Sequence, residues 1–323
     1  MRAAAIAALT TSLAATSLVA GDIVLNVPID CDLGTECFIQ QYVDHDRSRQ
    51  AMDFRCSNLS YDTHQGTDFA LRSIEQMRRG VDVIAAAPGT VQGTRDGMDD
   101  RLYRTGDAER INGRDCGNGV LIDHGDGWST QYCHLKRGSI AVAQGDLVEA
   151  SSVLGQVGLS GRTQFPHVHM TVRKDGDVVD PFDPDGDVQC GAPSTETLWD
   201  TPPPYRPGGV LEVGFADSVP DFNDIKAGTA TVALLPPDAP AIVVYGYAFG
   251  GKAGDRLQLR IDGPDGTLID DEVEIERNQA QFFRALGKKR TTAGWPTGQY
   301  TGTVVLRRGQ REISRVQNTT IVQ

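Results

Sequence analysis

The sequence predicts an all-β protein of two domains, in which a domain of antiparallel strands is followed by an Ig-like β-sandwich. The length of 323 residues favours two domains. The 36 glycines and 16 prolines are too many for a mainly helical protein and suit short strands joined by tight turns. From Val81 onward the apolar segments are short and end at turn residues, which indicates strands.

The composition excludes two broad classes. Asp and Glu number 43 against 31 Lys and Arg, so the net charge is −12 and a basic nucleic-acid-binding face is not expected. Hydrophobic residues make up 39% and charged residues 23%, a balance typical of globular proteins and not of disordered chains.

The first residues have the pattern of a secretory signal peptide, which we expect over residues 1–20. Residues 3–21 carry no charge, follow Arg2 and end in the small residues Ala20 and Gly21. A membrane anchor is the alternative, but the stretch is rich in Ala, Thr and Ser, and no second apolar run of spanning length follows. We therefore expect export without stable membrane insertion after cleavage.

The first domain is expected over residues 21–192. One helix is predicted at 71–79, where apolar residues recur at helical spacing before Gly80. The polar stretch 92–117 is interpreted as an insertion unless it borders the site. Strands are expected in the apolar segments 81–86, 90–91, 119–122, 139–142, 147–148, 153–157 and 167–172.

Six cysteines in an exported chain indicate disulfides. Cys116 and Cys133 flank a predicted hairpin of residues 119–124 and 129–133 around a Gly-Asp-Gly turn, so this pair is the first expectation. The other four, Cys31, Cys37, Cys56 and Cys190, have three pairings that the sequence leaves open.

Prolines and small polar residues at 193–209 indicate a stiff linker between the domains. Beyond it, the sandwich domain is expected over 210–323, since seven short strands in this length favour two packed sheets. We expect those strands at 210–215, 230–235, 241–249, 256–261, 273–275, 300–306 and 313–322.

Two histidine patterns point to a metal site. His64 and Asp68 lie four residues apart, and His167 and His169 lie two apart, so each pair shares one face of an extended segment. Gly66 argues against a helix and lets the backbone pass close to a ligand. Two imidazoles and one carboxylate with a fourth position left to water are typical of catalytic zinc.

Each histidine taken alone is better explained as an ordinary hydrogen-bonded residue, and only the combination favours a metal. His124, two residues from the turn, is interpreted as a strand residue satisfied by backbone. His45 has no patterned neighbour and is interpreted as a surface residue.

Three motifs in order resemble the lysostaphin-type, or LytM-domain, zinc metallopeptidases, which cut peptide crosslinks in peptidoglycan. The motif HQGTD from His64 to Asp68 is similar to the family's H-x-G-x-D, YCHL ending at Leu135 to its Tyr-x-His-Leu, and PHVH ending at His169 to its Pro-His-x-His. The resemblance covers about residues 63–184. Phe165 departs from the pattern, because a small residue is commoner before the last motif.

The resemblance implies an antiparallel β-roll in which His64, Asp68 and His169 bind Zn²⁺. It also implies that His134 and His167 are the uncoordinated catalytic pair. We expect His167 to act as the general base and His134 to stabilise the oxyanion.

The function that the resemblance implies is that of a periplasmic or secreted zinc endopeptidase, a hydrolase acting on the stem peptides of peptidoglycan. One alternative is an inactive LytM-like regulator with a protein partner, a cell-wall amidase. The presence of all three ligand residues speaks against it. A secreted peptidase for Gly-rich proteins is a second alternative.

Overall fold

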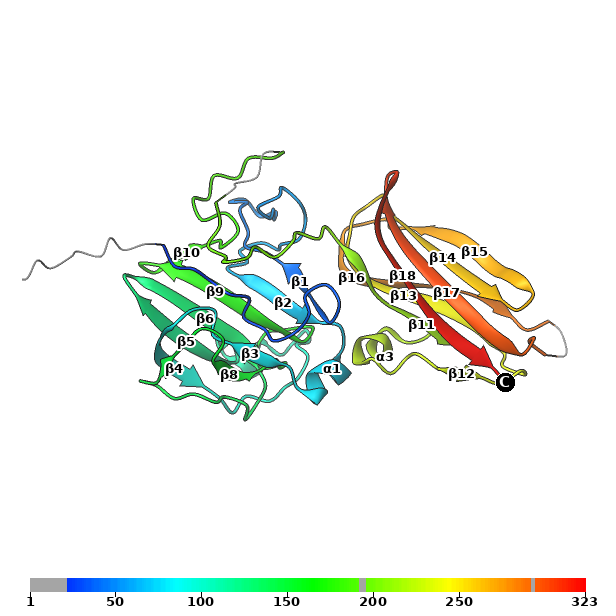
Figure 1. Cartoon of the computed structure of the whole chain (residues 1–323), viewed down its shortest axis with the longest axis horizontal. Coiled ribbons are helices and arrows are strands. Elements are labelled where there is room, and N and C mark those ends of the chain that lie inside the picture. Colours follow the sequence, from blue (N-terminus) through cyan, green and yellow to red (C-terminus); the bar gives the residue numbers. More distant parts are fainter. Residues whose placement is uncertain (1–21, 192–195, 292–293) are drawn as a thin grey trace, which may run out of the picture.

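The computed structural model describes residues 22–191, 196–291 and 294–323, which form two β-rich domains joined end to end (Figure 1). The prediction of a mainly β protein is confirmed. The three helices of the described residues are short: α1 (Ile74–Arg79), α2 (Ala108–Ile111) and α3 (Phe222–Ala227). The signal peptide predicted over 1–20 lies outside the described residues. Within the described ranges, no helix is long and apolar enough to cross a membrane.

The first domain is built on one eight-stranded sheet. Seven strands follow the order β1-β2-β9-β6-β5-β4-β7, β10 also pairs with β9, and each pair is antiparallel. A smaller sheet pairs β3 with β8. The bounds are β1 (Cys37–Gln41), β2 (Thr67–Leu71), β3 (Asp82–Ile84), β4 (Gly89–Arg95), β5 (Asn118–Gly125), β6 (Trp128–Leu135), β7 (Leu147–Val148), β8 (Val153–Gln156), β9 (His167–Lys174) and β10 (Asp177–Val179).

Alternation along the central strands builds the core of this domain. On β2, Phe69 is fully buried, and on β9 Val168 and Met170 are fully buried in the same cluster. The residues between them, including Asp68 and His169, project to the opposite face because side chains alternate along a strand. The apolar core thus fixes which face carries the polar residues.

The predicted hairpin and its disulfide are confirmed. β5 and β6 pair across a turn in which Gly125, Asp126 and Gly127 all have positive φ, and Cys116 is bonded to Cys133. The four cysteines whose pairing the sequence left open form the disulfides Cys31–Cys37 and Cys56–Cys190.

Two expectations in the first domain need correction, and a third, conditional one is decided. The helix begins at Ile74 and not at residue 71, because Leu71 still pairs in β2 and Ser73 caps the helix by accepting from the Gln76 N–H. Residues 139–142 form no strand. The stretch 92–117, interpreted as an insertion unless it borders the site, contains α2 and does border the candidate site described below.

The second domain is a sandwich of two sheets, with strand orders β11-β13-β16 and β12-β18-β17-β14-β15, packed on one shared core. Its Ig-like character stays a prediction. The strand predicted at 230–235 is limited to two residues, and both β16 and α3 were missed. The bounds are β11 (Gly209–Ala216), β12 (Leu234–Leu235), β13 (Ala241–Gly251), β14 (Arg256–Gly263), β15 (Gly266–Glu274), β16 (Gln279–Lys289), β17 (Gly298–Arg308) and β18 (Arg311–Val322).

The proline-rich segment predicted as a linker is partly built into the first domain. Leu198 and Trp199 are buried in the core of that domain, and Trp199 forms a bridge with Leu25. Tyr205 packs against the rings of Tyr42 and Phe54. The segment therefore runs along the first domain before the sandwich begins at β11.

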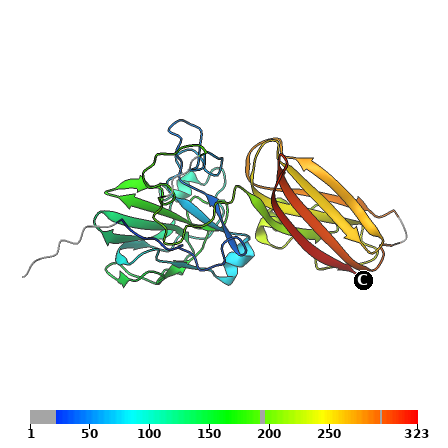
Figure 2. The ribbon, with the colours of Figure 1, turned by 45° about the horizontal axis from the view of Figure 1, so that its top comes forward.

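A separate apolar cluster joins the two domains, whose ribbons Figure 2 shows side by side from a second angle. It contains Phe38 from β1 and Ala70 from β2, packed against side chains of the sandwich that include Leu211, Tyr247 and Phe249. The rings of Phe38 and Phe249 lie 4.6 Å apart. This junction cluster fixes the sandwich next to the strand that carries Asp68.

Candidate metal centre

Three neighbouring strands carry most of the candidate residues. β9 lies between β2 and β6, and the register places His169 opposite Asp68 on one side and opposite Cys133 on the other. Directly opposed residues lie on the same face of a sheet. The antiparallel pairing therefore brings together Asp68 and His169, which are 101 positions apart in the chain.

His64 reaches this group from a turn. β2 begins only at Thr67, so the strand period proposed to place His64 beside Asp68 is wrong, although the two side chains do meet. The backbone N–H of His64 donates to Tyr61 O at 2.9 Å, and Thr63 has a φ of 66°, in the left-handed region. This turn, and not an extended strand, directs the His64 ring towards the carboxylate.

Gly66 permits the close approach that this turn requires. A Cβ at this position would lie 2.7 Å from Nε2 of His169 and 2.5 Å from Met170 O. Both distances are shorter than real side-chain carbons show, so another residue here would displace the backbone or the His169 ring.

The donor atoms of His64, Asp68 and His169 converge on one point. His64 Nε2 lies 3.1 Å from Asp68 Oδ1 and 3.1 Å from His169 Nδ1, and the last two atoms are 2.9 Å apart. Ligands about 2.0–2.1 Å from a tetrahedral zinc are separated by about 3.3 Å, close to these spacings. In the part of the chain that the structure describes, this is the cluster of His and carboxylate donors that could hold a metal ion.

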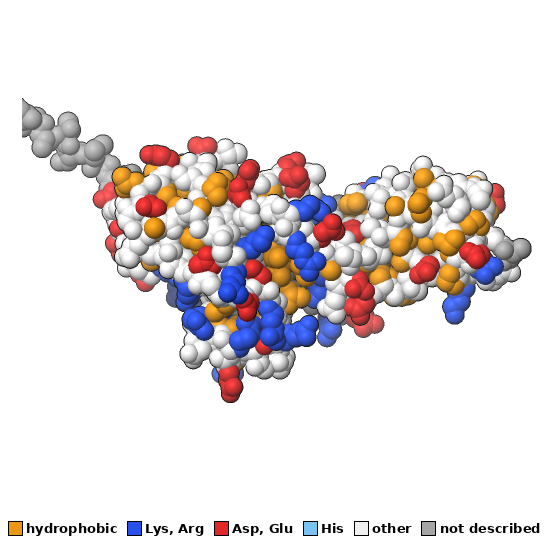
Figure 3. Space-filling model, turned by 90° about the horizontal axis from the view of Figure 1, so that it is seen from below, with side chains coloured by type: hydrophobic (Ala, Val, Ile, Leu, Met, Phe, Trp, Pro, Cys, Tyr) orange, Lys and Arg blue, Asp and Glu red, His pale blue; other side chains and the backbone are white. Residues whose placement is uncertain are grey.

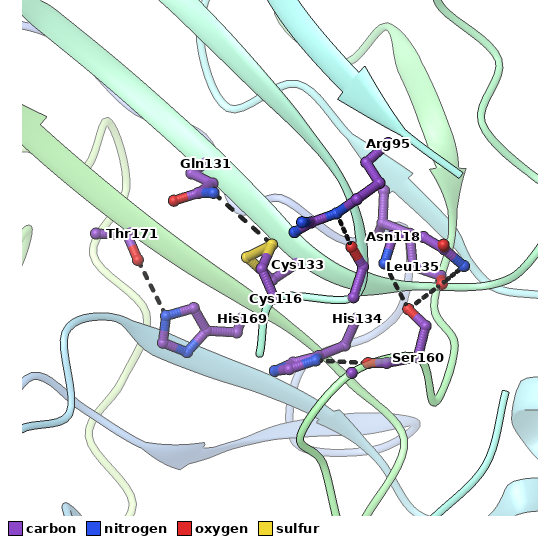
Figure 4. Close-up of a disulfide and its surroundings, with 12 residues drawn as sticks. Arg95, Cys116, Asn118, Gln131, Cys133, His134, Leu135, Ser160, His169 and Thr171 are labelled. Carbon is purple, nitrogen blue, oxygen red and sulfur yellow. Dashed lines mark hydrogen bonds between the residues drawn. A yellow bond between two sulfur atoms is a disulfide. The ribbon is translucent and has the colours of Figure 1, made fainter. Parts of the chain in front are cut away.

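The outer ring nitrogens support the same conclusion. His64 Nδ1 lies 2.6 Å from Tyr42 O, a carbonyl that can only accept, so Nδ1 carries the hydrogen and Nε2 presents a lone pair. His169 Nε2 lies 3.0 Å from Thr171 Oγ1, which can accept its hydrogen (Figure 4). Three lone pairs then face one another, and a cation between them would satisfy all three.

The electrostatics keep the carboxylate ionised. Burial acts to raise the pKa of Asp68, but the neighbouring His64 and His167 hold it well below its usual range. For His64, burial acts to lower the pKa, while Asp68 raises it above the ordinary value. Burial lowers the pKa of His169. The centre therefore combines one anionic oxygen with imidazole nitrogens in a protected site.

His134 sits beside this group at the end of β6, where the register with β5 shifts. Its φ is 65°, an uncommon conformation for a residue with a Cβ, which costs of order 1–3 kcal/mol. Its Nδ1 donates to Ser160 O at 2.8 Å, and burial holds its pKa well below the ordinary value. The ring is therefore neutral and presents a bare Nε2.

His167 lies on the other side of the His134 ring, with the two centroids 4.7 Å apart. Its Nδ1 donates to Phe165 O at 2.9 Å, which leaves Nε2 bare and 3.4 Å from Asp68 Oδ1. The Phe165 ring stacks on the imidazole at 4.3 Å and 23°. Phe165 also packs on the junction cluster, so the residue that departs from the family motif connects His167 to the sandwich.

The Cys116–Cys133 disulfide lies against His134 (Figure 4). Cys133 precedes the histidine in β6, and the carbonyl of Cys116 accepts from the His134 N–H at 2.8 Å. The covalent link thus joins the residue before His134 to the residue whose carbonyl accepts the His134 N–H.

The centre opens into a groove of about 1060 Å³ whose lining residues come from both domains. Tyr103 and Asp115 of the stretch 92–117 border it, and so do Gln279 and Gln281 of β16. The sequence did not indicate the residues from the sandwich, because β16 was not recognised as a strand. The alternation QAQFF at its start is the pattern that could have identified it.

The two remaining histidines gave different outcomes. His124 is satisfied by Pro88 O and Thr130 Oγ1, both at 2.7 Å, so its structural interpretation is confirmed. His45 is not a free surface residue. Its side chain is only 11% exposed, and its Nε2 lies 2.8 Å from Oδ2 of the buried Asp180.

A comparison with protein families identifies the segment that carries this geometry. Residues 62–181 match the model of peptidase family M23, and the match includes both His64 and His169. We call residues 62–181 the M23 segment, after the family model that they match. The M23 segment coincides with the first sheet from β2 to β9, and the sandwich domain lies outside it.

The curated relatives of the M23 segment include two named endopeptidases. The DD-carboxypeptidase/endopeptidase Mpg of Neisseria meningitidis is 33% identical over 106 residues, which are 33% of this chain and 22% of that protein. The peptidoglycan DD-endopeptidase ShyA of Vibrio cholerae is 33% identical over 33% of this chain and 19% of its own length. The match thus spans only about a fifth of these relatives.

Among solved structures, a catalytic domain of the prophage-encoded M23 protein EnpA from Enterococcus faecalis is 28% identical. The match covers 37% of this chain and 77% of that one, with a TM-score of 0.28.

Proposed function

We propose that this protein is an exported zinc-dependent endopeptidase that hydrolyses peptide crosslinks of peptidoglycan. The observation that carries the proposal is the convergence of His64, Asp68 and His169 donor atoms to within 2.9–3.1 Å inside an M23 segment. Its similarity to two named endopeptidases supports the substrate class.

In this proposal His64, Asp68 and His169 hold Zn²⁺, and their donor set of two imidazoles and a carboxylate suits that ion. When bound, zinc supplies a water of lowered pKa and polarises the scissile carbonyl. The hydrogen bonds to Tyr42 O and Thr171 Oγ1 orient the two imidazoles.

We assign the general base to His167. Its Nε2 is bare and lies 3.4 Å from the ligand oxygen of Asp68, within reach of a water molecule beside the centre. The Phe165 carbonyl accepts the Nδ1 hydrogen and would stabilise the imidazolium that forms when Nε2 takes the proton.

The role of His134 differs from the expected oxyanion stabiliser in one respect. A donor to an oxyanion needs a hydrogen on Nε2, which the neutral ring bonded to Ser160 through Nδ1 does not carry. We therefore propose that the bare Nε2 of His134 accepts a hydrogen bond from the attacking water and orients it, instead of donating to the oxyanion.

Export is proposed from the disulfides as well as from the N-terminal pattern. All cysteines among the described residues are paired, and disulfides persist in oxidising compartments such as the periplasm or the extracellular space. A periplasmic or secreted location also gives access to peptidoglycan.

The test is digestion of purified peptidoglycan sacculi with the mature protein, followed by mass analysis of the released muropeptides. We expect crosslinked dimers to be converted to monomers. The masses of the released muropeptides identify the bond that is cleaved. The His167→Ala protein serves as the matched control and should release at least 100-fold less, since general-base catalysis contributes roughly 10²–10⁴-fold.

Two outcomes would reject the proposal. Cleavage of a Gly-rich polypeptide with intact sacculi would favour the soluble-protein substrate instead. Unchanged sacculi together with stimulation of a separate wall amidase would favour the regulator.

A further inference from the structure

We propose that Arg162, Lys226 and Arg277 form a subsite across the domain junction that binds carboxylate groups of an acidic peptide substrate. This inference rests on the proposed function, because it names which part of the substrate the sandwich domain holds. Arg162 belongs to the M23 segment, whereas Lys226 lies on α3 and Arg277 just before β16.

All three cations line the same groove as the metal centre. The sandwich is held there by direct contacts between Gln40 of β1 and the start of β16. Gln40 Nε2 donates to Ala280 O at 2.9 Å, and Gln281 Nε2 donates to Gln40 Oε1 at 3.0 Å. The next residue of β1, Gln41, is the register partner of Asp68. The part of the groove that the sandwich forms therefore begins one strand away from Asp68.

The junction is rigid enough to form a binding surface. Gln40 is fully buried, and Tyr247 OH donates to Gln281 Oε1 at 2.7 Å, so the side chains at the contact satisfy one another. The junction cluster around Phe38 and Phe249 lies behind this contact. A preorganised wall binds without the entropic loss of ordering a mobile one.

The charge of the groove is opposite to that of the chain. The protein carries a net charge of −12, yet the charged residues that line the groove, apart from the centre itself, are four cations and two acids. These residues are Arg162, Arg173, Lys226, Arg277, Asp62 and Asp115. In an acidic protein, such a local excess attracts an anionic ligand to this groove.

The three proposed residues lie against aromatic rings or solvent and not against carboxylates. Arg162 lies over the Tyr103 ring at 5.5 Å and Lys226 over the Phe222 ring at 4.9 Å, while Arg277 is exposed. None of the three has a carboxylate oxygen within 4.0 Å among residues 22–191, 196–291 and 294–323. Each retains donor capacity for a carboxylate.

Arg173 shows the contrast. Its guanidinium donates to Gln131 Oε1 at 3.1 Å, so this cation is already engaged within the sheet.

Figure 3 shows Lys and Arg side chains gathered close to the junction of the two domains, around a hollow with apolar walls. Rings beside cations suit a peptide that presents both carboxylates and aliphatic carbons.

The experiment compares two preparations of sacculi, one with free peptide carboxylates and one with these groups chemically amidated. Binding of the full-length protein is measured by co-sedimentation, and cleavage is measured separately by release of muropeptides. The triple variant Arg162→Gln, Lys226→Gln, Arg277→Gln removes the charges. Lys289→Gln is the control, because Lys289 is an exposed cation at the far end of β16 and outside the groove.

We expect the triple variant to bind free-carboxylate sacculi at least tenfold more weakly than the wild type does, equivalent to about 1.4 kcal/mol. The triple variant and the wild type should bind the amidated preparation equally. KM should rise with kcat nearly unchanged, since the cations lie away from the reacting bond. The single variants should each produce part of the loss, and Lys289→Gln should produce none.

Two results would overturn the subsite: equal binding of the wild type to both preparations, or the same loss in Lys289→Gln. A wild type that prefers free carboxylates but releases no muropeptide would contradict the proposed function, whereas the binding measurement would still support the subsite.

Discussion

Asp68 is the residue on which the centre depends, because its Oδ1 faces three imidazoles. The distances are 3.1 Å to His64, 2.9 Å to His169 and 3.4 Å to His167. The sequence predicted all three partners, since two short motifs with a fixed spacing carry them. It did not predict the geometry by which His64 arrives, because the turn with a left-handed Thr63 leaves no periodic signal.

His45 shows what sequence patterns miss at the residue scale. Its partner Asp180 is 135 positions away, so nothing near His45 in the chain indicates the contact. Burial acts to lower the pKa of His45, but its hydrogen bond with Asp180 raises the pKa above the ordinary value. A histidine with a raised folded pKa binds its proton more tightly in the folded protein than in the unfolded one.

The prediction for this pair is a loss of stability on the alkaline side. Its contribution is fully present below the unfolded pKa of about 6.5 and is lost as the pH rises through the raised folded pKa. The free energies of unfolding of wild type and His45→Gln are measured in urea between about pH 5 and about pH 9, a range that brackets that pKa. The two free energies should converge as the pH rises.

His124→Gln is the control for that measurement. Burial lowers the pKa of His124, so its titration acts below the ordinary pKa and with the opposite sign. A difference between wild type and His45→Gln that stays constant across the range would contradict the raised pKa.

At the scale of elements, the antiparallel order β2-β9-β6 assembles the centre. The hairpin of β5 and β6 was predictable, because a Gly-Asp-Gly turn and flanking apolar residues are local signals. β16 was missed, although the alternation QAQFF at its start is a local strand signal, and its Phe283 packs on the junction cluster and not in the sandwich core. The sandwich residues in the groove were missed for that reason.

The Cys116–Cys133 disulfide should affect both stability and turnover. It links residues 17 apart, and the double variant Cys116→Ser, Cys133→Ser should lose about 3 kcal/mol of unfolding free energy. Turnover should also fall well below the unfolding temperature, because Cys116 O no longer holds the backbone of His134 in its left-handed conformation. Thermal denaturation and steady-state rates measure the two effects.

The corresponding control is the double variant Cys31→Ser, Cys37→Ser, which opens a loop with a separation of only 6. It should cost less stability and leave turnover unchanged. Full turnover in the Cys116→Ser, Cys133→Ser protein would show that the disulfide does not position His134.

At the scale of the whole molecule, the sandwich and the M23 segment share a buried cluster. Phe38, 3% exposed, belongs to this cluster, and its ring contacts that of Phe249 in the sandwich. The sequence predicted two domains and a linker, but the junction depends on contacts between residues more than 200 positions apart, such as Gln40 with Ala280. No local pattern carries that information.

We predict that the two domains unfold in one cooperative transition because of this cluster. Phe38→Ala should remove about 3–5 kcal/mol of packing energy at the junction and separate the transition into two. Differential scanning calorimetry resolves the difference. Leu257→Ala, a change within the sandwich core, should lower the transition temperature while the transition stays single. Two transitions in the wild type would contradict the shared cluster.

The proposed activity depends on one ion held by His64, Asp68 and His169. The most direct measurement is the zinc content of the purified proteins by mass spectrometry, together with their activity on sacculi. We predict about one zinc per wild-type chain, as three protein ligands and a water make one site. His64→Ala and Asp68→Ala should lose both zinc and activity, while His167→Ala should keep zinc and lose activity. A His64→Ala protein that retains full zinc and activity would contradict the account.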